Sequence, residues 1–204
     1  MNSFDNKAAH WDANEVRITM TKAISDEIVR RVPLSKQMRI MEYGAGTGLL
    51  SFSLRDKVGQ LLLADSSEGM LAVAREKITS TNATNMEARK LDLMTDEIPQ
   101  DKFDIIISQM ALHHVADIER IFQLFYKLLN EQGYLCIADL DKEDGSFHGH
   151  DFTGHNGFDR DELKNIAQKS GFEDIQFSTV FKMPRTGDDG SVREFPIFLF
   201  LAKK

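Results

Sequence analysis

The chain has 204 residues, of which 42% are hydrophobic and 28% charged, a balance typical of one globular domain. The net charge is −7, and no Lys/Arg cluster exceeds short pairs such as Arg30-Arg31, so we expect no nucleic-acid partner. The single cysteine, Cys136, excludes a disulfide framework and a multi-thiolate metal site. No run is apolar enough for a membrane span and the first residues lack a signal-peptide core, so we expect no membrane insertion and a cytoplasmic location.

Apolar periodicity predicts alternating helices and strands along most of the chain. Near-continuous apolar strands separated by amphipathic helices indicate a parallel sheet covered on both faces. The last two strands follow each other without a helix, so we expect an antiparallel hairpin at the far end of the sheet. The predicted elements are, in chain order, helix 14–32, strand 38–43, helix 48–57, strand 61–65, helix 68–79, strand 85–91, strand 103–107, helix 118–129, strand 134–140, helix 159–171, strand 175–183 and strand 195–202.

A glycine-rich turn follows the first predicted strand, in Glu42-Tyr43-Gly44-Ala45-Gly46-Thr47-Gly48. Glycines let the backbone turn sharply and approach a ligand closely. The helix that follows offers free N–H groups at its N-terminus. A nucleotide-like or amino-acid-like ligand would fit there, at the carboxyl ends of the strands.

Acidic residues stand at the ends of three successive predicted strands: Glu42, Asp65 and Asp92. Asp65 comes about twenty residues after the first glycine, where a carboxylate can accept hydrogen bonds from ribose hydroxyls; alternatively, Asp65 or Ser66 caps the next helix. Asp92 could accept from an exocyclic adenine amine, or it is an ordinary loop acid. Together the three acids predict a binding site for an adenosyl group.

With these motifs the sequence resembles the class I S-adenosylmethionine-dependent methyltransferases, of the small-molecule type that includes ubiquinone and menaquinone biosynthesis enzymes. Segment 42–48 matches the first motif of that family, Asp65 the second and Leu91-Asp92-Leu93 the third. Segment 103–108 with Leu112-His113-His114-Val115 is similar to the fourth, and segment 4–12 to an N-terminal segment that covers the cofactor. The resemblance implies a Rossmann-like, doubly wound seven-stranded sheet with the last strand antiparallel, and S-adenosyl-L-methionine as cofactor.

The resemblance also implies the site residues. One domain would span 1–204, with residues 1–37 as a helical cover and 141–158 as a lid over a small-molecule acceptor. Methyl transfer is an in-line displacement at a sulfonium carbon, so the protein mainly aligns the nucleophile and excludes water. The residues expected to line the cofactor pocket are Glu42, Gly44, Gly46, Asp65, Ser66, Asp92, Leu93 and Ser108.

Histidines are the candidates for a general base, which a proton-carrying nucleophile would need. His114 follows the fourth predicted strand, and His150 and His155 lie in the expected lid together with His148. We expect no metal ion, because Ser108-Gln109-Met110 stands where the metal-dependent catechol-type methyltransferases need an acid.

Two other functions remain open on the sequence. The first is a non-catalytic protein that binds S-adenosylmethionine or S-adenosylhomocysteine. The second is a nicotinamide-dependent oxidoreductase, whose fingerprint is G-x-G-x-x-G. Here the third glycine, Gly48, comes one place early for that fingerprint, and the chain has no room for the separate substrate domain that a dehydrogenase usually needs.

Overall fold

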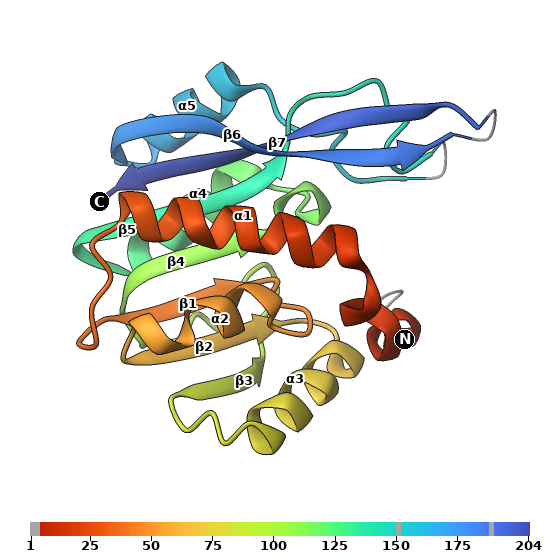
Figure 1. Ribbon diagram of the computed structural model, residues 1–204. Helices are drawn as coiled ribbons and strands as arrows, with labels where there is room; N and C mark the ends of the chain where they lie inside the picture. The colour runs from red at the N-terminus through yellow and green to blue at the C-terminus, as the bar shows by residue number, and fades with distance from the viewer. Residues whose placement is uncertain (1–4, 150–151, 188–189) are drawn as a thin grey trace.

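The computed structural model describes residues 5–149, 152–187 and 190–204. One seven-stranded sheet has the strand order β3-β2-β1-β4-β5-β7-β6 (Figure 1). The strands are β1 (Arg39–Tyr43), β2 (Gln60–Asp65), β3 (Met86–Lys90), β4 (Phe103–Gln109), β5 (Leu129–Leu140), β6 (Glu173–Thr186) and β7 (Val192–Lys203). The helices are α1 (Glu15–Arg31), α2 (Leu49–Leu54), α3 (Glu68–Ser80), α4 (Ile118–Leu128) and α5 (Arg160–Lys169), with 3₁₀ segments η1 (Asp5–Ala13), η2 (Arg55–Lys57) and η3 (Leu112–His114).

The expected strand arrangement is confirmed. Strands β1 to β5 pair in parallel, whereas β7 is antiparallel to both β5 and β6. The hairpin of β6 and β7 forms the far end of the sheet and extends beyond the other strands (Figure 1). This is the Rossmann-like topology of class I methyltransferases, with the carboxyl ends of β1, β2 and β4 at one edge.

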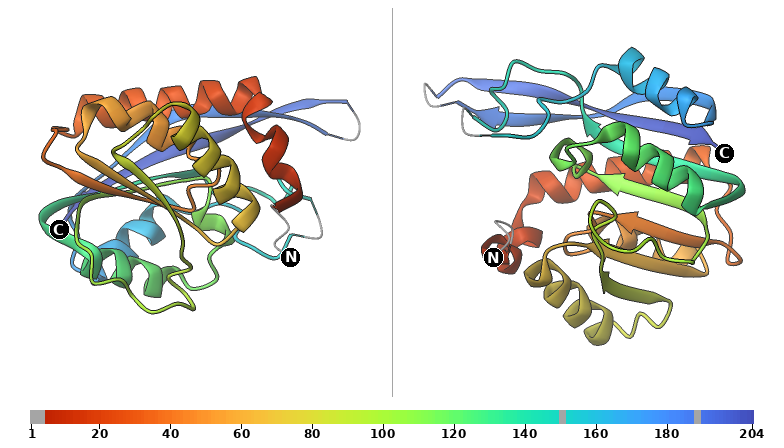
Figure 2. Two further views of the ribbon diagram at one scale, coloured as in Figure 1. Left: turned by 90° about the horizontal axis from the view of Figure 1, so that it is seen from below. Right: turned by 180° about the vertical axis from the view of Figure 1, so that it is seen from behind.

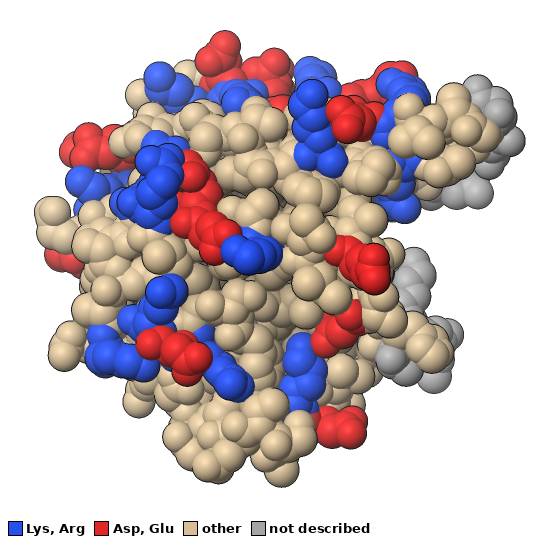
Figure 3. All heavy atoms as spheres, viewed as in Figure 1, with Lys and Arg blue, Asp and Glu red and all other residues tan. Residues whose placement is uncertain are grey.

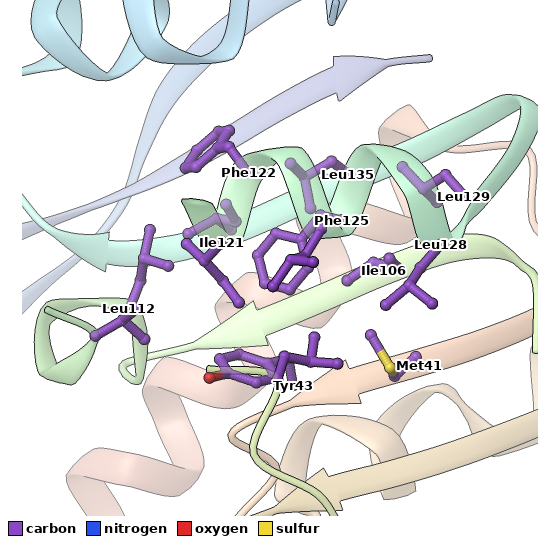
Figure 4. Close-up of a cluster of buried hydrophobic side chains, with 14 of the residues drawn as sticks. Met41, Tyr43, Ile106, Leu112, Ile121, Phe122, Phe125, Leu128, Leu129 and Leu135 are labelled. Carbon is purple, nitrogen blue, oxygen red and sulfur yellow. The ribbon is translucent and has the colours of Figure 1, made fainter. Parts of the chain in front are cut away.

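Both faces of the sheet are covered, which explains why the central strands are apolar throughout. Successive side chains of a strand point to opposite faces, so Ile40 belongs to the core cluster that includes residues of α1, α2 and α3, while Met41 belongs to the cluster that includes residues of α4 and α5. Figure 2 shows α4 and α5 on the face opposite α1. On the α4 face, rings of Tyr43, Phe122 and Phe125 meet in one buried cluster (Figure 4).

Several elements differ from their predicted bounds; β6 and β7 are longer at both ends than the predicted 175–183 and 195–202, and β5 and α2 differ as follows. Strand β5 begins at Leu129, directly after α4, rather than at residue 134. Leu129 is buried and pairs with Phe103, but the regular ladder resumes only at Tyr134 opposite Ile105, so the polar residues between them hid the start of the strand. Helix α2 ends at Leu54 and continues as the 3₁₀ turn η2.

Charged side chains of both signs are interspersed over the face that carries α1 (Figure 3). Glu27 on this helix pairs with Arg30 at 2.7 Å and with Arg31 at 3.5 Å. The first pair, in which Arg30 is exposed, contributes about 0–1 kcal/mol, as surface pairs do. Within the described ranges, no helix combines the length and the apolar character that crossing a membrane requires.

We predict that Phe122→Ala lowers the free energy of unfolding by about 3–5 kcal/mol, because it opens a cavity in the core. The Phe122 ring is fully buried and contacts the rings of Phe172 and Phe200 edge-on, with centroids 6.1 Å and 5.7 Å away. Urea titration followed by circular dichroism measures the change. Val192→Ala, at a residue 65% exposed, is the control. A loss below about 1 kcal/mol at Phe122 would contradict this packing.

Candidate active site

The glycine-rich bend after β1 lies at the carboxyl edge of the sheet. Gly44 and Gly46 have φ of +68° and +55°, a region that strains residues with a Cβ. A Cβ at Gly44 would also collide with the side chain of Ala111, in the loop after β4. The N–H of Ala45 donates to the carbonyl of Ala64 in β2 at 3.0 Å. The bend is therefore fixed between β2 and the loop after β4.

Asp65 is the last residue of β2 and ties the bend to the next helix. Its carboxylate accepts hydrogen bonds from the N–H of Gly46 and the N–H of Ser67, both at 2.7 Å. Burial raises the pKa of Asp65, these N–H groups oppose the rise, and the nearby carboxylate of Asp5 adds to it. A half-buried carboxyl group thus stands at the position where the sequence predicts a ribose contact.

The expected cap of α3 at Asp65 or Ser66 is wrong. The N-cap is Ser67, which has an extended backbone and accepts from the N–H of Met70 at 3.2 Å. Helical geometry begins only at Glu68, so Asp65 and Ser66 lie before the helix. Ser66 is exposed, and its contact with a cofactor stays a prediction.

Glu42 is buried at the end of β1, with a side chain directed at α2. Its Oε2 accepts from the N–H of Ser51 at 3.0 Å and from the Ser51 hydroxyl. Burial raises the pKa of Glu42 to about 7; the two bonds from Ser51 and the charge of Lys77 oppose the rise, and Asp65 adds to it. Glu42 therefore holds α2 against the bend and titrates near neutral pH.

The N-terminal segment η1 is anchored to the same edge by two further acids. The carboxylate of Asp5 accepts from the hydroxyl of Ser67 at 2.7 Å and from an N–H in the first turn of α3. Asp12 accepts from the hydroxyl of Thr47 at 2.5 Å and pairs with Lys77 at 2.7 Å. Sequence reasoning placed this segment near the cofactor but missed both anchors, since each joins residues far apart in the chain.

The remaining expected cofactor residues follow β3 and end β4. Asp92 is half-buried; its Oδ1 accepts from the N–H of Met94 at 2.9 Å, and its own N–H donates to Asp96 at 2.8 Å. The side chain of Leu93 is fully buried in the core. The hydroxyl of Ser108 is buried and has no hydrogen-bond partner within residues 5–149, 152–187 and 190–204.

A histidine and an aspartate form a buried pair that the sequence analysis did not predict. His113 Nδ1 lies 2.6 Å from Asp139 Oδ1, and both residues are buried. The same carboxylate accepts from the N–H of His113 at 3.2 Å and of Leu140 at 2.8 Å. Because Asp139 ends β5 and His113 lies in η3 after β4, the pair links two neighbouring strand ends.

His114 and His148 lie next to this pair. The ring centroids of His113 and His114 are 4.2 Å apart, and those of His113 and His148 are 4.8 Å apart. His148 stacks on Phe152 at 3.9 Å. The pKa of His148 is lowered to about 4, mainly by burial and further by the charges of His113, His114 and Arg185.

The other two candidate bases do not join this cluster. His155 Nε2 donates to the carbonyl of Val115 at 2.9 Å, and His155 lines a separate cleft of about 750 Å³ between the start of α4 and α5. His150 lies outside the described residues. Of the two candidate bases in the described segments, His114 and His155, only His114 is thus near the His113–Asp139 pair.

Segment 141–158 leaves the sheet after β5 and returns to it before α5. The two ends of this segment lie side by side, since the N–H of Glu143 donates to the carbonyl of Asn156 at 2.9 Å. Phe147 is buried and packs against Phe195 of β7 at 5.2 Å. Compact loops with adjoining ends are frequently functional, and the role of this segment as a lid stays a prediction.

Residues 34–171 match a family described as "Methyltransferase domain". The chain belongs to the S-adenosylmethionine-dependent methyltransferase family. An uncharacterized methyltransferase, C1347.09 of Schizosaccharomyces pombe, is 27% identical over 155 residues, which are 68% of this chain and 55% of that protein. The phosphoethanolamine N-methyltransferase of Plasmodium falciparum is 28% identical over 116 residues, which are 55% of this chain and 43% of that protein.

A solved structure supports the same fold. The crystal structure of an S-adenosylmethionine-dependent methyltransferase from Aquifex aeolicus has a TM-score of 0.73 to this chain, with 18% identity, and covers 98% of this chain and 97% of that one. The chain spans about half the length of these two sequence relatives. S-adenosylmethionine is the cofactor of this family.

The raised pKa of Glu42 predicts a pH-dependent stability. The folded protein binds the Glu42 proton more tightly than the unfolded chain does. The free energy of unfolding that this proton adds is therefore lost as the pH rises from 4.5 towards about 7. Only the wild type loses this contribution, because glutamine does not titrate. We therefore expect the unfolding free energy of Glu42→Gln minus that of the wild type to rise by up to roughly 3 kcal/mol between pH 5 and pH 7.5.

Urea titrations of ligand-free protein at the two pH values measure this difference. Glu76→Gln, at an exposed position of α3, is the matched control and should track the wild type at both. A difference between Glu42→Gln and wild type that does not change with pH would show that Glu42 titrates normally.

Proposed function

We propose that this methyltransferase domain transfers the methyl group of S-adenosylmethionine to a small-molecule acceptor. The observation that carries the proposal is the arrangement of the Gly44–Gly48 bend between the carboxylates of Glu42 and Asp65. The phosphoethanolamine N-methyltransferase relative acts on a small molecule by its name, which supports the same acceptor class here.

Several features of the site fit this cofactor. The carboxylate of Asp65 retains lone pairs for ribose hydroxyls besides the two N–H groups it accepts from. The buried, unpartnered hydroxyl of Ser108 within the described chain offers a hydrogen bond to a bound ligand. The bare backbone at Gly44 and Gly46 leaves space for the amino-acid tail, and Asp92 would accept from the adenine amine.

In this function the residues of the chain orient and enclose the reactants more than they react. Alignment of a nucleophile with the sulfonium methyl group can contribute roughly 7–11 kcal/mol. Segments 5–13 and 141–158 flank the carboxyl edge of the sheet, and both would exclude water from the bound cofactor. When bound, S-adenosylmethionine supplies an activated methyl group and a thioether leaving group.

Incubation with S-adenosylmethionine and a panel of small acceptors tests the proposal. The panel includes phenols, primary amines and phosphoethanolamine, and mass spectrometry measures S-adenosylhomocysteine and the methylated product. Product formation with one acceptor class supports the proposal. Tight binding without turnover on any acceptor would favour the non-catalytic binder, and the lack of any binding would contradict both.

We predict that Asp65→Ala weakens the binding of S-adenosylhomocysteine at least tenfold, about 1.4 kcal/mol, because it removes the ribose hydrogen bonds. Isothermal titration calorimetry measures the affinity. Asp56→Ala, whose side chain is 91% exposed, is the matched control and should bind as the wild type does. An unchanged affinity for Asp65→Ala would mean that the ribose is bound elsewhere.

A further inference from the structure

Three histidines from two separate segments converge beside the carboxyl edge of the sheet. His113 and His114 come from η3, and His148 comes from segment 141–158. One ligand atom from each lies within 4.8 Å of the other two. The backbone holds the two segments together, because the N–H of His155 donates to the carbonyl of His113 at 2.8 Å.

Asp139 fixes the orientation of the buried member of this cluster. Since its carboxylate is 2.6 Å from His113 Nδ1, that nitrogen carries the proton and Nε2 keeps its lone pair. Asp139 is itself held by two backbone N–H groups. A carboxylate behind a histidine is the usual outer shell of a protein metal site, where it orients the ring and raises its basicity.

One ring nitrogen of His148 is a second observation that points to a ligand here. Its ring stacks on Phe152 with an interplanar angle of 15°. Its Nδ1 is buried and accepts or donates no hydrogen bond within the part of the chain that the structure describes. A buried ring nitrogen without a partner is destabilising, and coordination of a metal ion would satisfy it.

We propose that His113, His114 and His148 bind one divalent transition-metal ion, with Zn²⁺ as the best fit. Imidazole nitrogens suit Zn²⁺, Cu²⁺, Fe²⁺ and Ni²⁺, whereas Mg²⁺ and Ca²⁺ prefer oxygen ligands. Metal–nitrogen bonds of about 2.0–2.1 Å require the nitrogens to move closer than 4.8 Å, which rotation of the exposed His114 side chain permits. This inference replaces the expectation of no metal.

The surroundings include charges of both signs. Arg185 opposes a cation near His148, but its guanidinium is exposed and lies over the Phe147 ring at 4.4 Å, so solvent screens its charge. The buried carboxylate of Asp139 offsets one positive charge of the ion. With three protein ligands, one coordination position stays open. As a ligand, His114 would not act as a general base.

Titration of the tag-free, chelator-treated protein with Co²⁺ tests this site, and Zn²⁺ then competes for it. We expect one Co²⁺ per chain, with the visible absorption of a nitrogen-ligated ion, and its displacement by Zn²⁺. His148→Phe keeps the stack on Phe152 but removes the ligand, so affinity should fall by more than the roughly 10–100-fold typical of an outer-shell change. For Asp139→Asn, which changes only the residue behind His113, the loss of Co²⁺ affinity should lie within that roughly 10–100-fold range.

Two controls separate coordination from packing. His10→Ala, at an exposed histidine outside the cluster, should bind Co²⁺ as the wild type does. Zn²⁺ should raise the Tm of the wild type but not of His148→Phe. Wild-type protein that gives no Co²⁺ absorption, or folded His148→Phe that binds Co²⁺ as tightly as the wild type, would overturn the proposal. These measurements use no cofactor, so they are independent of methyl transfer.

Discussion

Carboxyl groups of one buried and one half-buried acid, which accept backbone N–H groups, hold the functional edge of this protein together. Glu42 at the end of β1 accepts from Ser51 in α2, and Asp65 at the end of β2 accepts from Gly46 and Ser67. Each bond fixes a turn that leaves the sheet. The left-handed glycines and the first turns of α2 and α3 therefore depend on carboxyl groups that the fold partly desolvates.

This construction makes the edge electrostatically unfavourable without a cation. Burial raises the pKa of both Glu42 and Asp65, and neighbouring carboxylates add to the rise in each case. Lys77 offsets part of the charge from the α3 side. We expect a ligand with a net positive charge, as S-adenosylmethionine carries, to bind more favourably beside these carboxyl groups than a neutral nucleoside would.

The sequence predicts what depends on local pattern, and it misses what depends on distant contacts. Continuous apolar runs identified the buried strands, and the absence of a helix before residue 195 identified the terminal hairpin. Glycines after β1 located the bend, because few other residues adopt its backbone angles. The anchors of Asp5 and Asp12, and the approach of His148 to His113, join segments far apart in the chain. No local periodicity records them.

The most direct test is a crystal structure of the protein with S-adenosylhomocysteine. The account predicts that the ribose hydroxyls lie within hydrogen-bond distance of the Asp65 carboxylate and that the amino-acid tail rests on the bend at Gly44 and Gly46. A nucleoside bound at another edge of the sheet, with no contact to Asp65, would contradict it.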